Sequence, residues 1–318
     1  MPSRMYWMPA LVLWFASMSW LVSTKVLPTL TNGQPPDYSD ILPKTEVVNP
    51  APVRWSIRWN SKEIGWAENK ITRSMDGTGC IQSEVQFEEL PVDQMLQDLV
   101  GVMGSFAGPM FGEIGNIDLA VLTSLDFDHY GVLNRFETKV TVGDLEDLLH
   151  VQGIVKEEKL DLRSSVRTGS KPKQIFHKKE IHLPPDALLT DSFSPRPKLA
   201  NLHVGQTWTF QSYQPLMPHS PLTLIQANVE REELLEWNGQ MVRTRKVAFS
   251  RDSGSGISST RKPVAELWVQ RDGTVLRQDV MLASVKVQFV RVKMPVSSTE
   301  TVDEGHNESA TASGQFDD

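Results

Sequence analysis

The stretch VRWSIRW, residues 53–59, decides the fold. Its apolar residues at positions 53, 55, 57 and 59 alternate strictly with Arg54, Ser56 and Arg58. Successive side chains of a β-strand point to opposite faces, so this alternation predicts a half-buried strand of an antiparallel sheet. Asn60-Ser61-Lys62 follows as a predicted turn, after which the chain returns as a second strand.

The same period of two continues along most of the chain. Turn signals such as Asp76-Gly77-Thr78-Gly79 separate the alternating segments. Further strands are predicted over residues 64–74, 80–87, 117–126, 133–142, 149–155, 158–167, 174–182, 206–213, 223–236, 241–250, 263–271, 274–282 and 284–293. Residues 184–201 contain four prolines and are predicted to be a loop. The body is therefore expected to be mainly β, built from one or two curved antiparallel sheets.

One segment of the body has a helical period instead. Residues 92–106 place apolar side chains three and four positions apart, which predicts one amphipathic helix covering the sheet. Glycines then interrupt an apolar stretch up to residue 115, which predicts a flexible loop. Two interpretations of this loop stay open: its large apolar side chains close the core, or they form a lid over a concave sheet. The candidate ligand or lid residues are Trp55, Trp59, Met103, Phe106, Met110 and Phe111.

Residues 5–22, MYWMPALVLWFASMSWLV, form an uncharged apolar segment near the N-terminus. Eighteen helical residues rise roughly 27 Å, close to the hydrocarbon thickness of a bilayer, so the segment predicts a transmembrane helix. A cleaved signal peptide and a buried helix are the alternatives. No small-x-small cleavage site follows Val22, which favours an uncleaved anchor. We expect the body to lie on the exported side, in the periplasm or cell envelope.

The chain is expected to have five segments. They are a membrane anchor or signal over 1–25, a Pro-rich linker over 26–52, a half-barrel-like β unit with the helix over 53–200, a second antiparallel β unit over 201–296, and a disordered acidic tail over 297–318. A weak internal echo bears on the two β units, because Trp59-Asn60 and Trp237-Asn238 both precede a predicted turn. Either two sheets repeat one plan, or hairpins simply reuse the same turn chemistry.

Composition narrows the class of function. The net charge is −7, and residues 299–318 alone contain six acidic residues without a lysine or arginine. The remaining body is nearly neutral, which argues against nucleic acid as a partner. The single cysteine, Cys80, has no histidine near it in the sequence, and the seven histidines form no metal-binding motif. We therefore expect a protein without enzymatic activity, metal or cofactor.

Three short motifs resemble a known family. They are Arg58-Trp59-Asn60 running to Ile64-Gly65-Trp66, Val204-Gly205-Gln206-Thr207-Trp208, and Glu266-Leu267-Trp268-Val269 running into Arg271–Leu276. Together they resemble the bacterial envelope half-barrel proteins of the outer-membrane lipoprotein carrier type (LolA/LolB-like), and uncharacterised planctomycete envelope proteins. The resemblance spans roughly residues 53–294 and implies a curved antiparallel sheet that wraps an apolar cavity for acyl chains. This chain differs from that family in its anchor and in having one clear helix.

Two functions follow as expectations. The first is a non-catalytic, membrane-anchored envelope protein that binds a lipid or another apolar ligand in a concave β-sheet. The alternative is a structural or protein-interaction module of the cell envelope without a small-molecule ligand.

Overall fold

The protein is mainly β. The computed structural model describes residues 7–22, 50–91, 116–167, 174–184, 187–189, 193–216, 222–251, 262–282 and 285–293. These residues form one helix, α1 Trp7–Leu21, and a 15-stranded sheet. In chain order the strands are β1 Val53–Trp59, β2 Lys62–Arg73, β3 Gly79–Pro91, β4 Asn116–Phe127, β5 Leu133–Val142, β6 Leu145–Lys156, β7 Lys159–Val166, β8 Gln174–His182, β9 Leu188–Leu189, β10 Thr207–Tyr213, β11 Thr223–Trp237, β12 Gln240–Arg251, β13 Ala265–Val269, β14 Val275–Leu282 and β15 Val285–Arg291.

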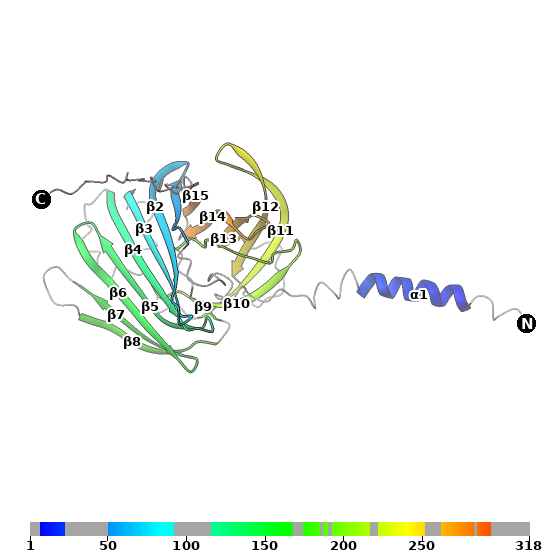
Figure 1. The fold of residues 1–318 in the computed structure, drawn as a ribbon, viewed down its shortest axis with the longest axis horizontal. Coiled ribbons are helices and arrows are strands. Elements are labelled where there is room, and N and C mark those ends of the chain that lie inside the picture. Colours follow the sequence, from blue (N-terminus) through cyan, green and yellow to red (C-terminus); the bar gives the residue numbers. More distant parts are fainter. Residues whose placement is uncertain are drawn as a thin grey trace, which may run out of the picture.

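All the strands belong to one open sheet. Its order is β8-β7-β6-β5-β4-β3-β2-β1-β15-β14-β13-β12-β11-β10-β9, and neighbouring strands are antiparallel except for the short parallel pair β9–β10. β1 pairs with both β2 and β15, which joins the two halves of the chain edge to edge. Figure 1 shows the sheet curving around its own interior. The expected choice between one and two sheets is thus resolved as one, whereas the proposed unit boundary at residue 200 stays a prediction.

The predicted strands are confirmed, with ends that differ by a few residues. The segment predicted as a loop over 184–201 also contains β9, which the prediction missed. The covering helix predicted over 92–106 lies outside the described residues.

Two hairpins explain the internal echo. Asn60 and Ser61 between β1 and β2 have φ of 47° and 67°, and Asn238 and Gly239 between β11 and β12 have φ of 51° and 72°. Two consecutive positive φ values are what a type I′ hairpin turn requires, and Asn and Gly tolerate them best. The shared Trp-Asn pattern therefore reflects the same turn chemistry at two places in one sheet.

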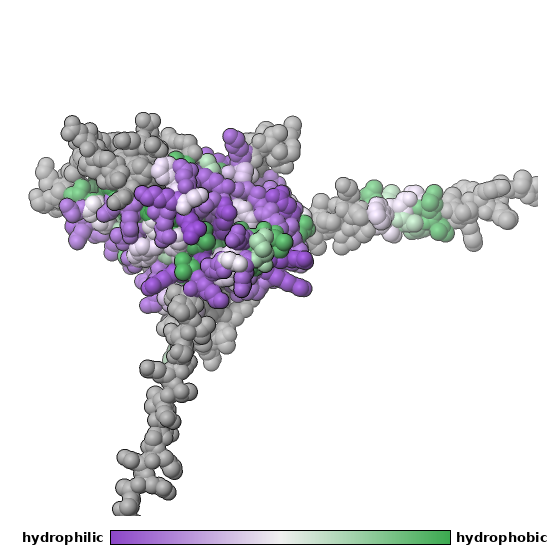
Figure 2. All heavy atoms as spheres, turned by 90° about the horizontal axis from the view of Figure 1, so that it is seen from above, coloured by the Kyte–Doolittle hydropathy of each residue, from purple (hydrophilic) through white to green (hydrophobic). Residues whose placement is uncertain are grey.

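The N-terminal apolar segment forms a helix of 15 residues. Its residues from Leu11 to Val22 are all exposed, and apolar (green) side chains are visible along it in Figure 2. No helix in the described residues is long and apolar enough to cross a membrane. Residues 5 and 6 of the predicted segment lie outside the described residues, so the transmembrane helix over 5–22 stays a prediction.

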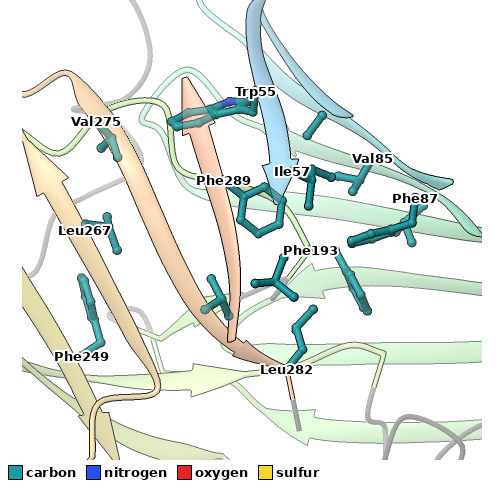
Figure 3. Close-up of a cluster of buried hydrophobic side chains, with 14 of the residues drawn as sticks. Trp55, Ile57, Val85, Phe87, Phe193, Phe249, Leu267, Val275, Leu282 and Phe289 are labelled. Atoms are coloured by element: carbon teal, nitrogen blue, oxygen red, sulfur yellow. The ribbon is translucent and has the colours of Figure 1, made fainter. Parts of the chain in front are cut away.

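The inner face of the curved sheet carries two apolar clusters. We call strands β1–β8 and strands β9–β15 the two arms of the sheet. Cluster 1 combines residues from both arms, including Trp55 and Ile57 of β1, Val85 of β3, Phe249 of β12 and Phe289 of β15. In Figure 3 these side chains lie on the same side of the sheet and converge on its interior. Burial of this apolar surface is the main stabilising contribution, at about 25 cal/mol per Å².

Cluster 2 lies on the same face, further along β3–β7 and toward the ends of the sheet. It includes Phe136 of β5, Leu162 of β7, Leu189 of β9 and Tyr213 of β10. β7 is next to one edge of the sheet, and β9 is the opposite edge. Side-chain packing in cluster 2 therefore brings the β9–β10 end against the inner face of the opposite arm.

The other face of β12–β15 carries an ion-pair network. Glu266 lies between Lys246, at 2.6 Å, and Lys286, at 3.2 Å. Burial by itself would raise the pKa of Glu266, but the hydrogen bonds and charges of the two lysines outweigh it and lower the pKa below its ordinary value.

This network predicts an acid-sensitive contribution to stability. Because the pKa of Glu266 is lower in the folded than in the unfolded chain, its contribution is present above about pH 4.3, the ordinary value for glutamate. The contribution is lost as the pH falls further, through the folded pKa. We expect the Glu266→Gln variant to be less stable than the wild type at neutral pH, and this difference to shrink between roughly pH 5 and pH 3. Urea unfolding over this pH range measures it, and a constant difference would contradict the prediction.

Candidate functional site

A row of small polar side chains crosses the inner face of the sheet. Asn69 of β2 pairs with Ser83 of β3, which pairs with Thr123 of β4, which pairs with Thr138 of β5. Val151 of β6 continues the register, and Ser164 of β7 ends it. The five polar members, which we call the polar row, are 1–4% exposed: Asn69, Ser83, Thr123, Thr138 and Ser164.

The polar row separates apolar neighbours on both sides. Val85 of β3, in cluster 1, lies two residues after Ser83, and Ile81, in cluster 2, lies two residues before it. Side chains two residues apart on a strand share a face. The interior of the sheet therefore has a narrow polar belt between two apolar surfaces.

Most of the polar row is hydrogen-bonded within itself. The indole N–H of Trp55 donates to Asn69 Oδ1 at 2.7 Å, and Asn69 Nδ2 donates to Ser83 Oγ at 3.2 Å. The hydroxyl oxygens of Thr123 and Thr138 lie 3.3 Å apart. At the end of the row, Ser164 Oγ is buried and has no hydrogen-bond partner among the described residues.

Two further polar atoms are buried without a hydrogen-bond partner. Trp208 Nε1, in cluster 1, and the Tyr213 hydroxyl, in cluster 2, also lack a partner in the described part of the chain. Burial raises the pKa of Tyr213 to about 12, so its hydroxyl stays protonated at neutral pH. A buried polar group without a partner costs about 1–3 kcal/mol, so native proteins keep few of them.

An irregular segment, residues 193–202, runs along the inner face and partly covers it. We call it the strap. Its backbone is held by side chains of the sheet: Arg196 N donates to Gln278 Oε1 at 3.0 Å, Arg291 Nη1 to the Pro197 carbonyl at 3.1 Å, and Arg245 Nη1 to the Leu202 carbonyl at 2.8 Å.

The strap also connects the two arms through its side chains. Phe193 packs edge-on against Phe87 of β3, with ring centroids 5.9 Å apart, and Leu199 and Leu202 belong to cluster 1. Figure 3 shows Phe193 between side chains of the two arms. Loops normally run over the surface because their backbone groups need water. Here, polar side chains of the sheet replace that water.

The structure places two of the six predicted ligand or lid residues. Trp55 is 1% exposed and uses its indole N–H within the polar row, so it is part of the packed interior. Trp59 is half-buried and packs against cluster 1. Met103, Phe106, Met110 and Phe111 lie outside the described residues, so the lid interpretation stays a prediction.

Sequence reasoning did not identify the polar row, which includes Ser164, nor the buried polar groups of Trp208 and Tyr213. A serine or threonine in an alternating strand is a weak signal, because only the pairing of strands shows that five such positions line up. A regular spacing of small polar residues at inward positions of successive strands is the one signal that points to the row.

The polar row, Trp208 and Tyr213 offer neutral hydrogen-bonding groups, whereas the guanidinium groups on the inner face, those of Arg245 and Arg291, bind the strap. In the part of the chain that the structure describes, no three metal-ligating side chains come together. The Cys80 Sγ atom lies 3.4 Å from Ser124 Oγ. The pKa of the Cys80 thiol is raised, mainly because the thiol is partly buried. Hydroxyl, amide and indole groups in an apolar enclosure can orient a mostly apolar molecule that carries a few polar atoms.

Comparisons with known proteins give structural likeness at low sequence identity. No protein-family model and no curated protein matches the sequence. A beta-barrel-like protein of the domain of unknown function DUF1849 from Brucella abortus matches with a TM-score of 0.46 at 10% identity, over 77% of this chain and 97% of that one. A DUF1089 family protein from Pseudomonas aeruginosa matches with a TM-score of 0.30 at 11% identity, over 74% and 95%. The chain is a large antiparallel β-sheet protein with structural similarity to these two.

Proposed function

We propose that this chain is a non-catalytic, membrane-attached protein of the cell envelope that binds a lipid or similar amphipathic ligand against the inner face of its curved sheet. One observation carries the proposal: Ser164 Oγ, Trp208 Nε1 and the Tyr213 hydroxyl are buried in an apolar interior without a partner among the described residues. The protein's own atoms cover these groups, so a ligand with an apolar body and a few polar atoms would reach them by displacing the side chains around them, and would then recover part of their desolvation cost.

Membrane attachment belongs to the same proposal. The segment 5–22 is uncharged, and the helix within it exposes large apolar side chains such as Trp14, Phe15 and Trp20. Such side chains are stable in a bilayer and costly in water. The body would then lie on the exported side. The sequence resemblance to LolA/LolB-like half-barrel proteins supports this proposal, since they too place an apolar ligand inside a curved sheet.

The Tyr213→Phe variant tests ligand binding. Full-length protein is purified from membranes in detergent, extracted with organic solvent, and the extract is analysed by mass spectrometry. We expect one class of amphipathic compound to co-purify with the wild type. Loss of one hydrogen bond of about 1 kcal/mol should reduce its retention by roughly fivefold in Tyr213→Phe. The variant removes only an oxygen atom, so the core packing is retained.

The matched control is Tyr130→Phe, because Tyr130 is 74% exposed and lies in a turn. It should retain the compound as the wild type does. The proposal fails if no compound co-purifies, or if Tyr213→Phe and Tyr130→Phe retain it equally.

The second candidate function is a protein-interaction module of the envelope. It is favoured by the strap, which already covers part of the inner face with Phe193, Leu199 and Leu202. In that case the interior is a packed core. Cross-linking of the full-length chain in membranes would then identify a protein partner, while the solvent extract would contain no bound compound.

A further inference from the structure

Two neighbouring turns of the sheet expose large apolar side chains. The turn at residues 74–78 joins β2 to β3, and the turn at residues 128–132 joins β4 to β5. Met75 is 88% exposed, Tyr130 74% and Val132 56%. The two turns touch, since a Cβ added at Gly77 would lie 3.2 Å from the Cβ of His129. We call this pair the apolar turns.

Both apolar turns have a defined conformation. Asp76 Oδ1 accepts hydrogen bonds from the backbone N–H and the hydroxyl of Thr78, at 3.0 and 2.7 Å. Asp128 Oδ1 accepts from the backbone N–H groups of Tyr130 and Val132, both at 2.9 Å. Each carboxylate is thus engaged by its own turn, and the apolar side chains are held outward.

The opposite rim of the sheet differs. Its described turns between β1 and β2 and between β5 and β6 expose Asn60, Ser61 and Asp144, which are all polar. On the rim with the apolar turns, the β6–β7 turn (Glu157 and Glu158) and the β11–β12 turn (Asn238 and Gly239) are polar as well, so the apolar patch is confined to the two neighbouring turns. A single exposed apolar residue needs no explanation, but a contiguous patch on one rim marks an interaction site.

The chain enters the sheet at the rim with the apolar turns. Val53, the first residue of β1, pairs with Asn69, and β2 ends four residues later at Arg73, just before Met75. At about 3.3 Å per residue, this places the start of β1 within roughly 20 Å of Met75 along the strand. Val292, which is 43% exposed, lies at the same place because its N–H donates to the Arg54 carbonyl at 2.9 Å. In the chain, helix α1 precedes this end of the body, with residues 23–49 between them.

We infer that the rim with the apolar turns faces a lipid bilayer and inserts Met75, Tyr130 and Val132 shallowly into it. This inference rests on the proposed membrane attachment through α1, and it adds the orientation of the body. A tyrosine suits the interface, because its ring is apolar and its hydroxyl reaches the head groups. Asp76 and Asp128 lie within the turns, and the described residues around them show no excess of basic side chains, so the recognised surface is the apolar one and insertion needs no anionic lipid.

Depth-dependent quenching tests the inference. Full-length Cys80→Ser protein carries one new cysteine, at Met75, Tyr130 or Asp144, each labelled with the same small fluorophore. The labelled proteins are reconstituted into phosphatidylcholine nanodiscs that contain nitroxide-labelled lipids. We expect loss of most of the fluorescence at positions 75 and 130, and none at position 144 on the opposite rim. All three sites lie in exposed turns, so the fold tolerates the substitutions, and circular dichroism checks this.

The outcomes separate the two proposals. Protein that co-elutes with nanodiscs but is unquenched at 75 and 130 would overturn the inference and leave the attachment intact. Quenching at 144 equal to that at 75 would also overturn it, as would protection of position 75 by a co-purified protein partner. Protein that does not co-elute with nanodiscs would overturn the membrane attachment itself, and the orientation with it.

Discussion

The Gly65→Ala variant is expected to lose about 3 kcal/mol or more of its free energy of unfolding. Gly65 lies in β2, where the pairing with β1 shifts register between Ile57 and Arg58, and its φ is +153°. A Cβ at this position would lie 2.0 Å from the backbone oxygen of Gln86 and 2.9 Å from the Cα of Phe87. Both atoms belong to the backbone of β3, so no side chain can move aside to make room.

Urea unfolding followed by tryptophan fluorescence measures this loss. The matched control is Gly143→Ala, in the turn between β5 and β6. Gly143 also has positive φ, at +53°, but an added Cβ meets nothing within 4 Å. The free energy of unfolding of this control should fall by only about 1–2 kcal/mol, which is the cost of holding alanine in a left-handed conformation. Equal losses in the two variants would mean that the contact between β2 and β3 is not as close as the structure places it.

The Asp279→Ala variant is expected to lose about 2 kcal/mol, because it removes the buried carboxylate that two partly exposed cations share. The Asp279 side chain is 1% exposed and lies on the face of β14 opposite to cluster 1. It accepts two hydrogen bonds from the Arg277 guanidinium, both at 2.7 Å, and lies 2.8 Å from Lys286 Nζ. The Arg277 guanidinium also stacks 4.5 Å from the centroid of the Trp268 ring. Without the carboxylate, two cations remain without their main acceptor.

Thermal and urea unfolding of two further variants test whether the buried charge of Asp279 causes this loss of stability. Asp279→Asn keeps the shape but loses the charge, and its loss should lie between those of the wild type and Asp279→Ala. Glu180→Ala removes an ion pair with Lys159 in which both side chains are more than half exposed, and it should leave the midpoint unchanged. If Asp279→Ala and Glu180→Ala behave alike, the cluster contributes no more than a surface pair.

The strands were predictable because their signal is local. The alternation in residues 53–59 reflects a strand with one face buried, and β1 has that range. Asn60-Ser61 and Asn238-Gly239 likewise indicate turns that need positive φ. Each signal depends on residues close in sequence, so no knowledge of distant partners is required. The face of each strand that is buried follows from the same alternation, as Trp55 and Ile57 show.

The candidate site was much less predictable. The polar row depends on the register of six successive strands, and the strap is an inward-running segment whose prolines suggest a surface loop. Tyr213 shares cluster 2 with Leu162, although some fifty residues separate them and their strands lie near opposite ends of the sheet order. No pattern within a short stretch of sequence shows that residues so far apart in the chain come into contact. Of the predicted site residues, the structure describes Trp55 and Trp59, and both lie on the interior side, as the alternation indicated.

By itself, the sequence determined that this protein is mainly β, where almost every strand lies, and which side of the first strand is buried. These properties arise from side-chain alternation and turn chemistry within a few residues. Only the tertiary structure decided that β1 and β15 join two halves into one sheet, that small polar groups form a belt between two apolar clusters, and that the apolar turns share a rim with the start of β1. The physical reason is that strand pairing and curvature bring together residues far apart in the chain, and their contacts leave no mark on local periodicity.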